Sequence, residues 1–218
     1  MKRVYLIRHG ITEANERWLY CGSTDLPLSD AGRAGLERLR ESMVYPETAG
    51  LRVYTTGLAR TEETMQLIWG EVPHTAVPEL REMAFGDFEM HSYCDLREMP
   101  EYRDWISGDN DKNRCPGGES GEDMTRRVLA AFWQQLLPAG DFLVVTHGGP
   151  IAAIMAQLFP KENRSRYDWQ PRNGMGYRID FDGERPVSWK EIPASRMKLS
   201  ITPEEERGEK QHAGFGGI

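Results

Sequence analysis

The sequence predicts an α/β protein with a mostly parallel central sheet. Residues 4–7 and 142–145 are continuously apolar and rich in Val, Leu and Ile, which is typical of strands buried on both faces of a parallel sheet. Between such strands, apolar residues three or four positions apart predict helices. Strands that alternate with helices characterise this fold class.

Length and composition indicate a single domain. With 218 residues, 39% of them hydrophobic and 28% charged, the chain is expected to form one globular domain, 1–193, followed by a polar tail, 194–218. No apolar run approaches the roughly 20 residues of a membrane span, and the N-terminus lacks the apolar core of a signal peptide. A cytoplasmic protein is therefore expected.

Cysteine usage and charge exclude several classes of function. Three cysteines without CxxC spacing, Cys21, Cys94 and Cys115, favour free thiols over a disulfide framework or a zinc site. The net charge of −7 disfavours nucleic acids and anionic membranes as partners. It is compatible with a small anionic substrate, because a few arginines in a cleft create a local positive potential.

The first strand ends in Arg8, His9 and Gly10. Ligands of α/β sheets bind beyond the carboxyl ends of the strands, and a glycine lets the backbone approach a bound group. A structural role fits this tripeptide about equally well, with Arg8 paired to a carboxylate and His9 packed near the core. In the loop that follows, Asn15 and the backbone near Gly22 could donate hydrogen bonds to an anion.

A helix and a second strand lead to another candidate residue. Ser29 is a suitable N-cap for a helix that continues to Met43. A strand is expected at residues 51–55, and residues 56–61 open the next helix. Arg60 then lies in the first turn of that helix, where the dipole and free backbone N–H groups favour an anion. The alternative is a solvated surface arginine.

An irregular segment and an insertion follow. The segment contains four carboxylates, among which residue chemistry does not choose a proton donor: Glu79, Glu82, Asp87 and Glu89. Residues 87–118 form a polar insertion that could cover a site as a lid. Trp105 could contact a leaving group there, but a role in anchoring the insertion to the core is favoured.

From residue 120 onward, a helix, a last strand and the tail are expected around the strand at residues 142–145 and the helix that follows it. Ser120 and Asp123 form a capping-box pattern before a helix that continues to Leu137. A final strand is expected at residues 177–181. The tail from residue 194 lacks periodicity and is expected to be loosely ordered.

The opening pattern recurs after residues 142–145, where His147 and Gly148 follow a buried strand and Pro150 is expected at the first position of a helix. Two strand ends that each carry a histidine favour a shared functional site. A metal site is the rival interpretation, but zinc usually needs a third protein ligand, and no HExxH pattern is present. The other histidines are expected at the surface: His74, His91 and His212.

With Arg8-His9-Gly10, Arg60 and His147 in place, the chain resembles the histidine phosphatase superfamily, in the branch that includes cofactor-dependent phosphoglycerate mutase. The resemblance extends from residue 4 to about residue 180. Within the family, the loop at residues 19–28 is most similar to α-ribazole phosphatase and broad-specificity phosphatase members. Further matching positions are Thr12, Asn15, 25–29, 82–89, 118–120 and 146–148.

The resemblance implies a three-layer α/β/α sandwich and phosphoryl transfer without a metal or another cofactor. His9 is expected to attack phosphorus and become a phosphohistidine, and Glu82 to protonate the departing oxygen. The residues expected around the phosphate are Arg8, Arg60, His147, Asn15, Cys21, Gly22 and Gly148. Two departures from the family are Cys21, where a hydroxyl residue is common, and Met90-His91, where many members have glycine.

Elementary chemistry agrees with these roles. A nucleophilic imidazole presents one unprotonated nitrogen, so its other ring N–H should be held by an acceptor. Two arginines and two histidines can neutralise the charge that spreads over the phosphoryl oxygens. The predicted function is hydrolysis of a small phosphorylated metabolite, such as α-ribazole 5'-phosphate or a sugar phosphate. The alternatives are a phosphoglycerate mutase, for which the chain is short, and an inactive module that binds a phospholigand.

Overall fold

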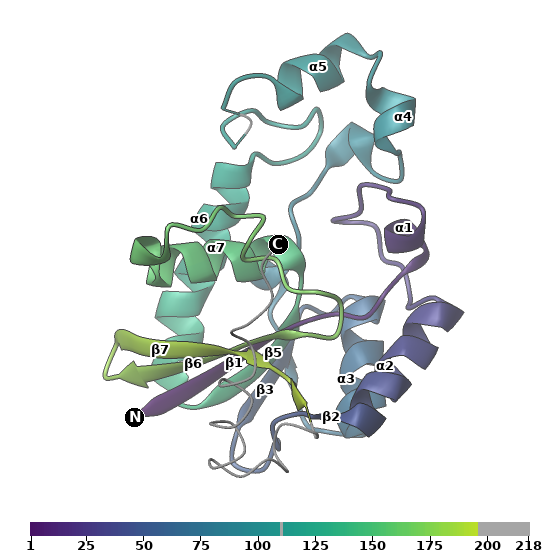
Figure 1. The fold of residues 1–218 in the computed structure, drawn as a ribbon. Coiled ribbons are helices and arrows are strands. Elements are labelled where there is room, and N and C mark those ends of the chain that lie inside the picture. The colour runs from purple at the N-terminus through teal and green to yellow at the C-terminus, as the bar shows by residue number, and fades with distance from the viewer. Residues whose placement is uncertain (110, 196–218) are drawn as a thin grey trace, which may run out of the picture.

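The computed structural model describes residues 1–109 and 111–195. Among these residues, six strands form one mixed sheet in the order β4-β3-β5-β1-β6-β7, and β2 pairs with β8 (Figure 1). The strands are β1 (Lys2–Arg8), β2 (Met43–Val44), β3 (Arg52–Thr55), β4 (Thr75–Ala76), β5 (Phe142–Thr146), β6 (Gly176–Asp182), β7 (Arg185–Ile192) and β8 (Ala194–Ser195).

Helices cover the sheet and build the segments above it. The α-helices are α1 (Glu13–Glu16), α2 (Asp30–Ser42), α3 (Ala59–Trp69), α4 (Tyr93–Leu96), α5 (Pro100–Ile106), α6 (Gly121–Ala131) and α7 (Gly148–Leu158). Short 3-10 turns are η1 (Pro78–Leu80), η2 (Gly86–Phe88), η4 (Leu137–Ala139) and η5 (Pro160–Glu162), and η3 (Phe132–Leu136) is a π-helical turn.

The alternation of side chains along β1 produces the three layers. Val4 and Leu6 pack into the large core cluster with residues of α6 and α7. Tyr5 and Ile7 point to the other face and pack into a second cluster with Met65 of α3. Helices α2 and α3 therefore lie on one side of the sheet and α6 and α7 on the other (Figure 1). The predicted α/β/α sandwich is confirmed.

Side-chain caps begin α2 and α6 as expected. The Ser29 side chain caps α2 by accepting a hydrogen bond from the backbone N–H of Gly32 at 3.0 Å. Ser120 and Asp123 form the expected capping box of α6. The regular helix that was expected to reach Leu137 ends at Ala131 and continues as the turns η3 and η4.

The C-terminal part of the sheet contains the expected strand and one more. The strand expected at residues 177–181 is confirmed as β6, which runs antiparallel to β1 and forms a hairpin with β7, a strand that was not predicted. β7 is an edge strand with mostly exposed side chains, so it lacks a clear apolar alternation. Ala194 and Ser195, expected in the tail, pair with β2 as β8. The rest of the predicted tail, 196–218, lies outside the described residues.

The predicted insertion at about 87–118 contains η2, α4 and α5, which lie beyond the end of the sheet in Figure 1. Tyr102 and Trp105 of α5 are 1% and 8% exposed and belong to the large core cluster. The aromatic residues therefore anchor this segment, as favoured for Trp105. No helix in residues 1–109 and 111–195 has the length and apolar character needed to cross a bilayer.

Candidate active site

Parallel pairing of β1 with β5 brings two histidines together. Arg8 is in register with Thr146, and the backbone N–H of His9 donates to the Thr146 carbonyl at 2.9 Å. The next residue on each strand is therefore a histidine at the same edge of the sheet. The ring centroids of His9 and His147 lie 5.0 Å apart, and both residues are buried. Such rings can contact one tetrahedral anion.

The contacts of His9 identify its free nitrogen. Its Nδ1 lies 2.6 Å from the carbonyl oxygen of Gly10. Because a carbonyl only accepts hydrogen bonds, Nδ1 carries the proton and Nε2 keeps its lone pair. Thr64 and Asn173 fix this turn, since the Gly10 N–H donates to Thr64 Oγ1 and Asn173 Nδ2 donates to the carbonyls of His9 and Gly10. This is the arrangement that a nucleophilic imidazole requires.

His147 is held differently. Its Nδ1 accepts a hydrogen bond from Arg60 Nε at 3.3 Å, and its Nε2 lies 3.0 Å from Thr56 Oγ1. In the neutral ring, Nε2 therefore carries the proton and Nδ1 is unprotonated. Both ring nitrogens have protein partners, so His147 suits a supporting role beside the anion better than nucleophilic attack.

Arg60 is buried, not a solvated surface residue. It is 1% exposed in the first turn of α3, and its Nη1 and Nη2 donate to the carbonyls of Thr24 and Gly22 at 2.8 and 2.7 Å. These contacts place a fixed positive charge beside His147. Arg60 also ties the loop around Gly22 to the helix.

Arg8 keeps an unused donor. Its Nη1 donates to the carbonyl of Pro171 at 2.9 Å. Within the part of the chain that the structure describes, its Nε is buried without a hydrogen-bond partner. A buried cationic donor without an acceptor is costly, and a bound anion would satisfy it. Among residues 1–109 and 111–195, Arg8 forms no ion pair with a carboxylate within 4 Å, so the alternative of a structural ion pair is not supported.

The N-terminus of α7 holds Glu82. His147 is the N-cap of this helix, which begins at Gly148, so Pro150 is its third residue and not its first as expected. Glu82 accepts hydrogen bonds from the N–H groups of Gly149 and Met83, at 2.9 and 3.0 Å. These two hydrogen bonds fix the direction of the Glu82 carboxyl group at the N-terminus of α7.

The remaining predicted contacts lie around this centre. Gly148 is the first residue of α7, so its N–H has no acceptor within the helix. Asn15 lines the cavity next to Arg8, where its Oδ1 accepts from the N–H of Thr12. Cys21 lines the same cavity. The N–H of Gly22 already donates to Glu89 at 3.0 Å, so Gly22 contacts the site through its carbonyl on Arg60.

Glu89 has a separate task. Its carboxylate accepts hydrogen bonds from the N–H groups of Gly22, Ser23, Thr24 and Phe85. Burial alone raises the pKa of Glu89, but these hydrogen bonds outweigh it and lower the pKa below its usual value. Glu89 therefore stays ionised and holds the loop together. Glu79 and Asp87 are exposed, which leaves Glu82 as the carboxylate next to the histidines.

A cavity lined by aromatic residues opens beside Arg8 and Glu82. It has a volume of about 510 Å³, and among its lining residues are Arg8, Glu82, Tyr20, Tyr102, Trp105 and Tyr167. A second cavity of about 1050 Å³ shares Arg8 and Asn15 and adds the exposed Trp18. The organic part of a bound phosphate ester could lie in these two cavities.

No cluster of three or more His, Cys, Asp or Glu residues within residues 1–109 and 111–195 could hold a metal ion. The other two described histidines lie at the surface as expected: His74 pairs with Glu62 at 2.7 Å, and His91 is exposed. His212 lies outside the described residues.

Three residues of the site were not among the predicted ones: Thr56, Thr64 and Asn173. Thr64 lies one turn after Arg60 on α3, so helical spacing was a usable signal. Thr56 follows β3 directly, at the same edge of the sheet as the histidines. Asn173 gives no such signal, because it lies in an irregular segment far along the chain.

The environment of the two histidines predicts a pH-dependent stability. Burial lowers the pKa of His9 and of His147 well below 6.5, and the charge of Arg60 lowers both further. Between these lowered values and pH 6.5, the unfolded chain binds more protons than the folded protein, so the free energy of unfolding falls as the pH falls. We expect a loss of about 1 kcal/mol per histidine between pH 6.5 and 5.5, measured by urea unfolding.

The variant His9→Gln isolates the contribution of one ring. Carboxylates elsewhere titrate equally in both proteins, so the variant should lose about 1 kcal/mol less than the wild type over this interval. Equal losses in the two proteins would show that His9 is not held neutral by its surroundings.

Comparison with known proteins places this site in a family. A family model described as the histidine phosphatase superfamily (branch 1) matches residues 4–191. The "Adenosylcobalamin/alpha-ribazole phosphatase" of Salmonella typhimurium is 32% identical over 187 residues, which cover 82% of this chain and 90% of that protein. The "Probable phosphoglycerate mutase GpmB" of Yersinia pestis is 30% identical, with 83% of this chain and 86% of that protein covered. The crystal structure of the α-ribazole phosphatase from Shigella flexneri matches with a TM-score of 0.72 and 26% identity, covering 88% of this chain and 96% of that one.

Proposed function

The chain belongs to branch 1 of the histidine phosphatase superfamily, and on this basis we propose that it hydrolyses a small phosphate monoester through a phosphohistidine on His9. One observation carries the assignment. The unprotonated Nε2 of His9 lies in a buried site next to a second histidine, and the Nε of Arg8 there has no partner among the described residues.

The reaction runs in two steps. In the first, His9 Nε2 forms a bond to phosphorus, the bond to the leaving oxygen breaks, and Glu82 donates its proton to that oxygen. In the second, Glu82 takes a proton from a water molecule whose oxygen attacks phosphorus. The P–N bond then breaks and inorganic phosphate leaves. Arg8 and Arg60 stabilise the charge on the phosphoryl oxygens in both steps, and His147 joins them when its Nε2–H exchanges Thr56 Oγ1 for a phosphoryl oxygen.

The substrate class follows from the aromatic cavity and the relatives. Tyr20, Tyr102 and Trp105 line the space beside Glu82, where the leaving group must lie. A planar ring system on the leaving group can pack against such side chains. The relative from Salmonella typhimurium is named for α-ribazole, so α-ribazole 5'-phosphate is the proposed substrate, and a simple sugar phosphate is the second choice. The cytoplasmic location and the absence of nucleic-acid and membrane partners remain predictions.

A substrate panel tests the proposal. The purified protein, with a chelator present, is assayed on α-ribazole 5'-phosphate, ribose 5-phosphate and 3-phosphoglycerate. We expect phosphate release, fastest from α-ribazole 5'-phosphate, and no isomer formation from 3-phosphoglycerate. Isomer formation faster than phosphate release would favour the mutase reaction of the relatives named GpmB. Binding of phosphate without turnover of any ester would favour an inactive module.

A further inference from the structure

The segment that carries Glu82 has little regular structure of its own. Glu82 lies between the short turns η1 and η2, outside any helix or strand. Backbone carbonyls in such a segment have no partners within a helix or a ladder, so other groups must satisfy them. The side chains that do so decide where the Glu82 carboxylate is held.

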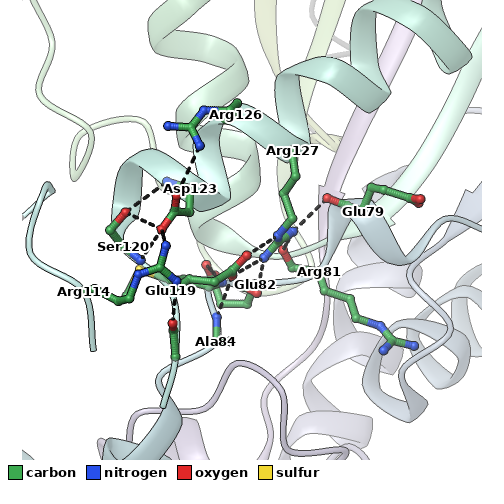
Figure 2. Close-up of polar contacts among 12 residues, drawn as sticks. Glu79, Arg81, Glu82, Ala84, Arg114, Glu119, Ser120, Asp123, Arg126 and Arg127 are labelled. Carbon is green, nitrogen blue, oxygen red and sulfur yellow. Dashed lines mark hydrogen bonds and ion pairs between the residues drawn. The ribbon is translucent and has the colours of Figure 1, made fainter. Parts of the chain in front are cut away.

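Arg127 of α6 supplies these partners. Its Nη1 donates to the carbonyls of Glu79 and Arg81, and its Nη2 donates to the carbonyl of Glu82, each at 2.8 Å (Figure 2). Its Nε and Nη2 also donate to the two carboxylate oxygens of Glu119 at 2.7 Å. All five N–H groups of the guanidinium are therefore used, which no lysine could reproduce.

Glu119 holds the other side of the same segment. Its Oε2 accepts the backbone N–H of Ala84 at 2.9 Å, and its own N–H donates to the carbonyl of Ala84 at 2.8 Å (Figure 2). Burial raises the pKa of Glu119, but the hydrogen bonds from Arg127 and Ala84 outweigh it and keep the pKa below its usual value. The ion pair thus stays charged at neutral pH.

We propose that Arg127 and Glu119 are positioning residues that clamp the backbone on both sides of Glu82 and so aim its carboxyl group at the leaving oxygen. This inference rests on the proposed role of Glu82 as the proton donor. Neither Arg127 nor Glu119 is among the residues that line the 510 Å³ cavity, so they act through Glu82 and not by contact with the substrate.

A comparison of two substrates of similar size tests the clamp. Benzyl phosphate releases a poorly acidic alcohol that needs a proton donor, whereas 4-nitrophenyl phosphate releases a stable phenolate. For Arg127→Lys, we expect kcat/KM to fall about tenfold or more on benzyl phosphate and less than about threefold on 4-nitrophenyl phosphate, because a misplaced acid loses part of its contribution. Glu119→Gln should show the same selective loss, and the double variant should lose little more than either single one.

The matched control is Arg126→Lys, the same substitution one residue earlier, where the side chain is exposed and pairs with Asp123. It should leave kcat/KM unchanged on both substrates.

Equal losses of kcat/KM on the two substrates for Arg127→Lys and Glu119→Gln would indicate general damage to the fold and overturn the clamp. The absence of a loss on either substrate would overturn it as well. Glu82→Gln is the reference: if it lacks the selective loss, the role of Glu82 itself is wrong and the clamp falls with it. If only the Arg127 and Glu119 variants lack it, the clamp alone is wrong.

Discussion

The variant His9→Ala is expected to lose phosphate ester hydrolysis almost completely, with kcat reduced by about 10⁴-fold or more on every substrate. The substitution removes the Nε2 atom that forms the covalent bond. His147 cannot replace it, because its Nδ1 faces Arg60 and its Nε2 faces Thr56. The measurement is phosphate release in the presence of a chelator, together with the amount of phosphoenzyme trapped after rapid quenching.

The control for this variant is His74→Ala, which removes a surface histidine that contacts Glu62. It should retain full turnover and the trapped phosphoenzyme. Turnover of His9→Ala within about tenfold of the wild type would refute the nucleophile assignment, because no binding contribution alone could restore a lost covalent step.

The parts of the fold that local pattern determines were predictable. The apolar runs 4–7 of β1 and 142–145 of β5 indicated strands buried on both faces, and such strands pair in parallel at the centre of a sheet. Once they pair in parallel, His9 and His147 must meet at one edge. β7 was missed because its side chains are largely exposed and show no apolar alternation, although Asp182-Gly183 before it is a typical hairpin turn and offered a usable signal.

In the site, too, features set by neighbouring residues could be predicted, whereas contacts between distant segments could not. Helical position suggested an anion site at Arg60, but its burial depends on the carbonyls of Gly22 and Thr24, more than thirty residues away in sequence. Glu82 and Glu89 are chemically equivalent in the sequence and lie in one irregular segment. Only the folded chain separates them, since Glu82 lies at the N-terminus of α7 and Glu89 binds the loop after Cys21. Residue chemistry alone could not make that choice.

Gly149 offers the sharpest test of the position of Glu82. A Cβ atom added at Gly149 would lie 2.1 Å from Glu82 Oε1 and 3.0 Å from its carboxyl carbon. The carboxylate is the end of a flexible side chain, so Gly149→Ala can fold once Glu82 moves away. We therefore expect a small change in the unfolding temperature and a loss in kcat/KM of about 10²-fold or more on benzyl phosphate, the order that a general acid contributes.

The same substitution at Gly35 is the control, because a Cβ there meets only the flexible end of Arg38 at 3.9 Å. Gly35 lies inside α2, where alanine should leave activity unchanged and raise the free energy of unfolding by about 0.5–1 kcal/mol. A Gly149→Ala variant with undiminished turnover of benzyl phosphate would mean that the carboxylate does not act from its place beside α7. Intact stability together with lost turnover would instead support the proposed role of Glu82, because a group that serves only in proton transfer can be displaced without loss of folding stability.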